Sequence, residues 1–312
     1  MADSLLPDRH KQRDFFTCDI FDSFKDDIAS MEHPVFSLSK KPDHRMLEYE
    51  RNGTTIKIKP SYTGLATIFD KDILLYLASA LMSAKNSGEA ISQTVRFTSY
   101  DYIVSTNKSL GGTQYKLLKE GLERLNGTLI QTNIKTGAVE ETKEFGLIES
   151  WGIVKEDAKG KAIAIEVKLS DWFYNSILGN AVLTIDKDYF RLRKPTERRL
   201  YELARKHCGN QVAWKISLVN LKEKLGVTSQ MKLLRFNIKK ITETNHLPEY
   251  NISMEDDVVL FSRKGPPKEN NTPAGLSKYV TKKEIEKQAK PGETYKQATN
   301  RIKGLKAALG TK

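Results

Sequence analysis

The spacing of apolar and polar residues changes from helical to extended along this chain, and the changes occur twice in the same order. In the first half, a period of three to four residues predicts helices at 70–86, 99–106 and 113–126, with a short strand at 94–97. Thr98 caps the second helix and Gly127 closes the third. Alternating segments at 128–133, 145–154 and 162–169 predict strands, with a hairpin tip at 136–138. Helix, helix, turn, helix and hairpin is the order of a winged helix-turn-helix.

The second half repeats this order in a shorter form. Its pattern predicts helices at 195–207, 217–225 and 231–244, a strand at 212–216 and a hairpin of 250–253 with 258–262. We therefore expect an α+β fold with two tandem winged helix-turn-helix domains, at residues 61–180 and 181–264. Residues 1–60 are expected to form an N-terminal segment that packs on the first domain.

Proline and glycine mark the start of a C-terminal tail at residues 265–312. Gly265-Pro266-Pro267 is linker chemistry that a packed element does not tolerate. Further on, apolar residues recur at three and four positions with lysines between them, which predicts an amphipathic basic helix: Tyr295, Ala298, Ile302, Leu305 and Leu309. Two interpretations of this tail remain: a solvated helix, or a helix that contacts DNA, a membrane or a partner.

The third helix of the second domain carries a basic face. Its core stripe is Leu234, Ile238 and Ile241, and no acidic residue lies between Met231 and Thr242. A recognition helix buries one stripe and turns a polar or basic face into the major groove. The DNA-contacting residues expected here are Ser229, Gln230, Lys232, Arg235, Lys239 and Lys240, with Asn237 as a further polar group. The alternative is a solvated basic face on an ordinary helix.

The third helix of the first domain is a weaker candidate, because Glu120 and Glu123 interrupt its basic residues and carboxylates repel phosphate. We expect it to enter a groove mainly by its first turn. The candidate contacts are Thr113, Gln114, Lys116 and Lys119. A role in dimerisation is the alternative for this helix.

A third basic cluster lies near the start of the second domain. Residues 191–206 carry a net charge of +5. Arginines at the entry to a helix suit phosphate contacts, which position a protein without reading sequence. Arg193, Lys194 and Arg198 are the candidates, and pairing with Glu197 and Glu202 is the alternative.

The net charge of +12 over 312 residues is concentrated in the C-terminal half: residues 1–180 carry −2, 181–261 carry +5 and 262–312 carry +9. Such a field indicates a polyanionic partner. The chain shows no secretory signal and no apolar run long enough for a membrane span, so we expect a cytoplasmic protein without a membrane partner. Cys18 and Cys208 do not make a disulfide framework.

Recognisable catalytic patterns are missing from the sequence. Gly160-Lys161 lacks the remaining residues of a phosphate-binding loop, and the histidines stand singly rather than in metal-binding pairs. Asp26-Asp27 and Asp256-Asp257 are interpreted as structural, at a helix start and a hairpin tip. We therefore expect no enzyme activity, no metal and no cofactor; a nickase or primase is the less favoured reading.

Several strings in the chain resemble the plasmid replication initiator protein A (RepA-like) family. The most specific are Asp188-Tyr-Phe-Arg-Leu-Arg-Lys-Pro195 and Glu197-Arg-Arg-Leu-Tyr-Glu-Leu-Ala-Arg-Lys-His-Cys-Gly209. Others are Gly64-Leu-Ala-Thr-Ile-Phe-Asp-Lys-Asp-Ile73, Phe145-Gly-Leu-Ile148 and Leu169-Ser-Asp-Trp172. The similarity runs in order from about Asp14 to Arg263 and does not include the tail.

The resemblance implies an initiator that binds double-stranded DNA at repeated sites of a plasmid origin and helps to recruit the host initiator and the replicative helicase. Homodimer formation is part of the same expectation, as is association with the bacterial nucleoid or plasmid. A transcriptional regulator or autorepressor on the same scaffold is the nearest alternative, and the sequence does not separate the two. No contact residue is carried over from the family, so the candidate sites above depend on helical geometry alone.

Overall fold

The computed structural model describes residues 5–10, 15–18, 35–39, 41–51, 54–136, 139–155, 162–178, 182–209 and 211–265. All of these lie in one unit of the chain, which ends at Gly265. The amphipathic helix expected in the tail and the Asp26-Asp27 pair lie outside the described residues.

The helices of the first half follow the predicted order. They are α1 (Lys71–Asn86), α2 (Ser99–Ser105) and α3 (Gly112–Gly127), with strand β4 (Thr94–Phe97) before α2. The Thr98 hydroxyl accepts a hydrogen bond from the Asp101 amide and so caps α2, as the sequence predicts. Gly111, with φ at 148°, supplies the bend into α3 that a residue with a Cβ rarely adopts.

The strands after α3 belong to different sheets. β5 (Leu129–Thr136) and β6 (Val139–Gly146) form a hairpin that continues a sheet with β2 (Leu47–Arg51) and β3 (Thr54–Lys59), in the order β2-β3-β5-β6. β7 (Ile148–Lys155) and β8 (Ala162–Leu169) pair with β4 instead, in the order β4-β8-β7. The hairpin expected directly after α3 is therefore present, but its strand β5 pairs with the N-terminal strand β3. The strand β4, which precedes α2, pairs instead with β8 of the antiparallel pair β7 and β8.

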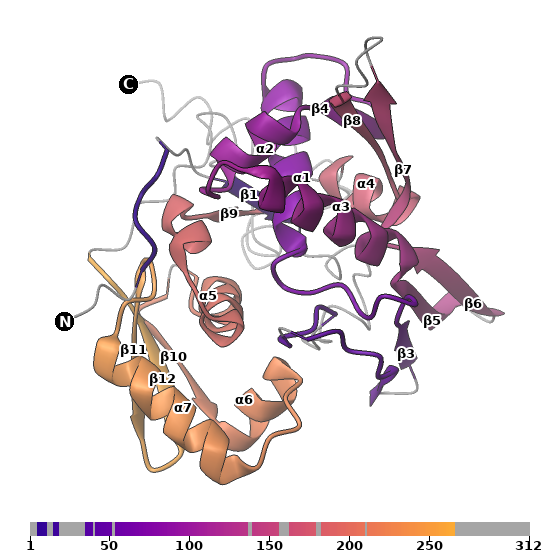
Figure 1. Ribbon diagram of the computed structural model, residues 1–312. Helices are drawn as coiled ribbons and strands as arrows, with labels where there is room; N and C mark the ends of the chain where they lie inside the picture. The colour runs from indigo at the N-terminus through magenta and orange to yellow at the C-terminus, as the bar shows by residue number, and fades with distance from the viewer. Residues whose placement is uncertain are drawn as a thin grey trace, which may run out of the picture. The chain divides into compact units, whose positions relative to one another are not determined.

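The second half contains α5 (Pro195–His207), β10 (Ala213–Ser217), α6 (Leu218–Leu225), α7 (Met231–Thr244), β11 (Tyr250–Glu255) and β12 (Val258–Arg263). Its sheet has the order β10-β12-β11, so the strand before the second helix again pairs with the last strand of the hairpin. Figure 1 shows α7 alongside these strands. We call α1, β4, α2, α3, β7 and β8 the first repeat, and α5 to β12 the second repeat.

Local chemistry explains the boundaries of the second repeat. The Ser217 hydroxyl accepts from the Asn220 amide at the start of α6, and Gly226 ends α6 in the left-handed conformation with φ at 63°. Asp256 and Asp257 connect β11 to β12, both with positive φ, as a two-residue hairpin turn requires.

Several short elements are not predicted by the sequence. β1 (Phe15–Cys18) pairs antiparallel with β9 (Val182–Ile185), α4 is Asp171–Leu178, and a 3₁₀ helix spans Lys187–Arg191. Each is four to eight residues long. The pairing of β1 with β9 joins segments that lie far apart in the chain.

Two hydrophobic cores occur among the described residues, and α1 contributes to both. Ile73, Leu74 and Leu77 of α1 lie in the first core, with residues of α2, α3 and β8. Leu75 of the same helix lies in the second core, with residues of α5, α6 and α7. Because α1 is buried by both cores, it is the element through which the two repeats contact each other.

Candidate nucleic-acid interface

The outer face of α7 is basic and exposed. Leu234, Ile238 and Ile241 are buried as the sequence predicts, and the residues opposite them point to solvent. Lys232, Lys239 and Lys240 are exposed there. Within the described part of the chain, the ammonium groups of Lys232 and Lys239 have no acidic partner, so both remain available to phosphates.

The turn before α7 adds polar side chains at the same end of the helix. Gln230 is the N-cap residue and is exposed, while Ser229 beside it is half-buried. Neither side chain forms a hydrogen bond within the described residues. Short polar groups at the first turn of a helix are placed to reach base edges when that turn enters a groove.

Arg235 has a partner within the chain, which the sequence did not indicate. Its Nε and Nη2 atoms donate to the two carboxylate oxygens of Asp257, at 2.7 and 2.6 Å. The hydrogen bonds to Asp257 raise the pKa of Arg235, and those from Arg235 lower the pKa of Asp257. Arg235 is only half-buried, so its predicted DNA contact stays a prediction, and its guanidinium also holds the turn between β11 and β12 against α7.

Two apolar side chains interrupt the basic face of α7. Leu233 and Phe236 are both 52% exposed, although the helix buries three other aliphatic residues. Neither residue is among the predicted contacts, although the position of both outside the stripe of Leu234, Ile238 and Ile241 indicates exposure. The Lys240 ammonium lies 4.4 Å from the centroid of the Phe236 ring.

The first turns of α3 are also open to solvent. Thr113, Lys116 and Lys119 are exposed, and Gln114 is half-buried. The Lys116 ammonium is 3.8 Å from the Glu120 carboxylate, a surface pair that contributes little to stability. Further along α3, Arg124 donates twice to the Asp70 carboxylate at 2.8 Å, so its charge is used within the fold.

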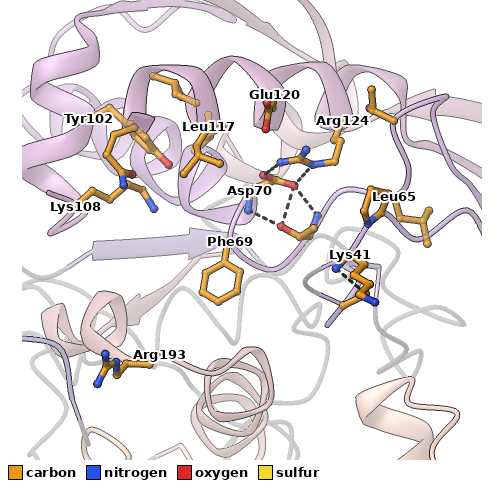
Figure 2. Close-up of a pocket in the computed structure, with 17 residues that line it drawn as sticks. Lys41, Leu65, Phe69, Asp70, Tyr102, Lys108, Leu117, Glu120, Arg124 and Arg193 are labelled. Carbon is orange, nitrogen blue, oxygen red and sulfur yellow. Dashed lines mark hydrogen bonds and ion pairs between the residues drawn. The ribbon is translucent and has the colours of Figure 1, made fainter. Parts of the chain in front are cut away.

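A hollow of about 480 Å³ lies beside the start of α3. Figure 2 shows Leu117, Glu120 and Arg124 of α3 above it and Arg193 below it. Gln114 lines the same hollow, so the fold brings together two predicted contact residues that are distant in the sequence, Gln114 and Arg193. Lys41, from the N-terminal segment, is a lining residue that the sequence analysis did not identify.

The three arginines and lysines expected to hold phosphates have different surroundings. Arg193 is exposed and has no acidic partner among the described residues. Lys194 is exposed too, but its ammonium lies 3.0 Å from Glu197. Arg198 is only 3% exposed and cannot reach a phosphate, so its expected role in DNA binding is wrong.

Arg198 forms instead a buried ion pair between the two repeats. Its Nη1 atom donates to the Asp72 carboxylate at 2.5 Å, and its guanidinium lies over the rings of Phe69 and Tyr189. Lys108 also donates to Asp72, at 2.7 Å. The sequence could not reveal this pairing, because Asp72 and Arg198 are 126 residues apart.

A second ion pair supports the same junction. Lys71 at the start of α1 lies 2.9 Å from Glu202 of α5. Burial by itself raises the pKa of Glu202, but the charges of Lys71 and Arg199, together with the hydrogen bonds from Lys71 and Tyr189, hold that pKa below its ordinary value. Two ion pairs, Arg198 with Asp72 and Lys71 with Glu202, thus join the two repeats.

None of the helices among the described residues combines the length and apolarity needed to cross a bilayer. In the same residues, no group of three or more histidine, cysteine, aspartate or glutamate side chains is placed to hold a metal ion.

The fold defined by these elements has solved counterparts. A crystal structure of domains 2 and 3 of RctB superposes with a TM-score of 0.55 and 11% identity, covering 76% of this chain and 96% of that one. A second crystal structure of RctB domains 2–3 gives the same score over 75% of this chain. At this identity the likeness concerns the fold alone, which is the mixed α+β arrangement expected from the sequence.

The chain belongs to the replication initiator protein A family, whose pattern it matches over residues 25–252. A chain of Wigglesworthia glossinidia brevipalpis that carries the name of a replication protein is 43% identical over 267 residues, covering 83% of this chain and 96% of the relative. The resemblance found in the sequence strings is thereby confirmed. Initiation of DNA replication is the function that this membership supports.

Proposed function

We propose that this protein is a non-enzymatic initiator that binds double-stranded DNA at a plasmid origin, sequence-specifically, through two winged helix-turn-helix domains. The observation that carries the proposal is the exposed face of α7, where Lys232 and Lys239 have no acidic partner in the described chain. The equivalent sheet orders of the two repeats, β4-β8-β7 and β10-β12-β11, support the winged-helix interpretation.

In this proposal α7 enters a major groove, whose width admits an α-helix. Lys232, Lys239 and Lys240 neutralise phosphates, while Ser229 and Gln230 reach base edges from the first turn. The turn of β11 and β12 is the wing, and the pair of Arg235 with Asp257 fixes its position relative to α7. Arg235 is therefore a positioning residue for the DNA contact.

The first repeat makes a second contact. Thr113, Gln114, Lys116 and Lys119 at the start of α3 meet a neighbouring groove, with Arg193 and Lys194 on the intervening phosphates. Helix-turn-helix units that bind together meet half-sites one helical turn apart, about 34–36 Å. We therefore propose that the origin carries repeated sites, each contacted by both repeats.

The remaining elements of the proposal concern partners and location. DNA bound in this way would place the protein where it helps to recruit the host initiator and the replicative helicase, and homodimers on paired sites are part of the proposal. The protein would act in the bacterial cytoplasm, associated with its plasmid.

The proposal is tested by footprinting on the plasmid that encodes the protein, at about 0.15 M salt. The wild type is compared with the double variant Lys232→Ala/Lys239→Ala. Lys215→Ala serves as a control, because Lys215 is exposed on β10 and lies on a different element. Protection of repeated sites that is lost in the double variant and kept in the control is the expected result.

Uniform coverage that fades with salt would contradict the proposal, because it would mean that the positive charge binds phosphate without recognising sequence. A plasmid-maintenance assay separates an initiator from a protein that only represses its own gene. For an initiator, the double variant should lose plasmid maintenance and the Lys215→Ala control should keep it.

A further inference from the structure

Leu233 and Phe236 are large apolar residues on the exposed face of α7. Each is 52% exposed, whereas Leu234, Ile238 and Ile241 of the same helix are at most 2% exposed. Leu233 and Phe236 are three positions apart, so their side chains lie next to each other on the helix surface. The core already buries the other stripe of this helix, so only a binding partner outside the described residues could cover these two side chains.

Positive charge surrounds this pair of residues. Lys232 and Lys240 lie four positions to either side of Phe236, and the Lys240 ammonium is 4.4 Å from the ring centroid. The nearest acidic residue of the helix in the C-terminal direction is Glu243, in the last turn. A partner that covers Phe236 must therefore be apolar at the centre and negatively charged on both sides.

DNA has this combination in its major groove. The C5 methyl group of thymine is the apolar group that base pairs present there, and phosphates border the groove on both sides. An aromatic or aliphatic side chain on a helix in the groove can bury that methyl group while lysines on the same helix contact phosphates.

We propose that Phe236 and Leu233 contact thymine methyl groups, and that the site read by α7 therefore requires thymine at defined positions. This inference rests on the proposed function, since it assumes that α7 occupies a major groove. It adds the base that is selected and the residues that select it.

The test replaces single thymines by deoxyuridine in a duplex that carries the footprinted site. Deoxyuridine pairs like thymine and lacks only the methyl group. Affinity is measured by fluorescence anisotropy for the wild type, Phe236→Ala and Lys215→Ala. A buried methyl group contributes about 0.8 kcal/mol, so the wild type should lose about fourfold in affinity at each contacted position.

Phe236→Ala should bind the thymine duplex more weakly than the wild type does, and should bind the thymine and deoxyuridine duplexes equally at the position that Phe236 contacts. Lys215→Ala should keep the fourfold difference. Phe236→Leu is the second variant, because its smaller apolar side chain should retain part of the difference while preserving the helix.

Four results would overturn the inference. Equal loss on deoxyuridine substitution in the wild type and in Phe236→Ala assigns the methyl contact to other residues. A specific footprint that no deoxyuridine changes removes the thymine requirement and leaves the proposed function standing, whereas the absence of any specific footprint removes both. The fourth result is a wild-type dimer that Phe236→Ala converts to monomers while the thymine dependence stays unchanged. That result assigns Phe236 and Leu233 to an interface between two copies of the chain.

Discussion

The ion pair of Arg235 with Asp257 lies beside the exposed face of α7 that we propose to bind DNA. The guanidinium of Arg235 uses two of its nitrogens on the Asp257 carboxylate. The Asp257 carbonyl oxygen also accepts from the Leu218 amide at the start of α6. The turn between β11 and β12 is therefore tied to both α6 and α7.

This arrangement predicts that Arg235→Ala and Asp257→Asn lower the affinity for the specific site by the same factor, because each breaks the same contact. The double variant should be no weaker than either single variant. Anisotropy titrations of the three variants provide the measurement. If Asp257→Asn instead binds as well as the wild type while Arg235→Ala binds poorly, Arg235 contacts DNA directly.

Asp43 makes the free energy of unfolding depend on pH in the acid range. Its carboxylate accepts from both Nε and Nη2 of Arg45 and from the Ser37 hydroxyl. The hydrogen bond with Arg45 is the main cause that lowers the pKa of Asp43 from 3.8 to about 2. The unfolded chain therefore takes up this proton first as the pH falls.

The contribution of Asp43 should be fully present above about pH 4 and should be lost as the pH falls toward 2. It amounts to about 2 kcal/mol in the free energy of unfolding. Urea unfolding of the wild type and Asp43→Asn at about pH 6 and about pH 3 should show a smaller difference at the lower pH. A difference that is independent of pH would show that Asp43 acts only by its shape and neutral hydrogen bonds.

At the level of elements, the turn between α6 and α7 sets the direction of the candidate recognition helix. Gly226 ends α6 in the left-handed region at φ 63°, where a residue with a Cβ is strained. Gly226→Ala should lower the free energy of unfolding by about 1–2 kcal/mol. Gly226→Asn should cost less, since asparagine tolerates this conformation.

Gly152→Ala is the matched control, because Gly152 has no positive φ and a Cβ there would meet no atom within 4 Å. Thermal unfolding of the three variants tests the prediction. Equal stability of the Ala variants at 226 and 152 would mean that the turn does not hold Gly226 in the left-handed conformation.

The sequence predicted the helices well and the strand partners poorly. Caps and periodicity are local, so the residue pattern alone located α5 and α7 at their observed ends, Pro195–His207 and Met231–Thr244. Partner choice is not local: nothing in 128–133 indicates that β5 pairs with β3. The same limit applies to the candidate site, where an exposed lysine such as Lys232 is predictable and the burial of Arg198 by a distant aspartate is not.

For the whole molecule, Asp72 is the most deeply buried charged residue at the contact between the two repeats. It is fully buried in α1 and accepts from both Arg198 and Lys108. Removing one partner of a buried ion pair leaves an uncompensated charge, which costs about 3–5 kcal/mol. Asp72→Asn should lower the free energy of unfolding by that amount.

Glu166→Gln is the control for Asp72→Asn, because Glu166 pairs with Arg96 at the surface and its loss should cost below about 1 kcal/mol. The double variant Asp72→Asn/Arg198→Met should recover part of the lost stability, since it removes the unpaired charge. Chemical denaturation measures all of these variants. Equal effects of Asp72→Asn and Glu166→Gln would show that the buried pair does not stabilise the contact between the repeats.

In the proposed complex, Lys232 and Lys239 of α7 contact phosphates beside a specific site. The most direct measurement is the salt dependence of affinity for the footprinted duplex and for a scrambled duplex. Each lost phosphate contact should reduce the slope of log affinity against log salt by about 0.9. Lys232→Ala/Lys239→Ala should therefore lower the slope by about 2 and Lys215→Ala should leave it unchanged. An unchanged slope in the double variant would place the DNA on another face of the molecule and contradict the account.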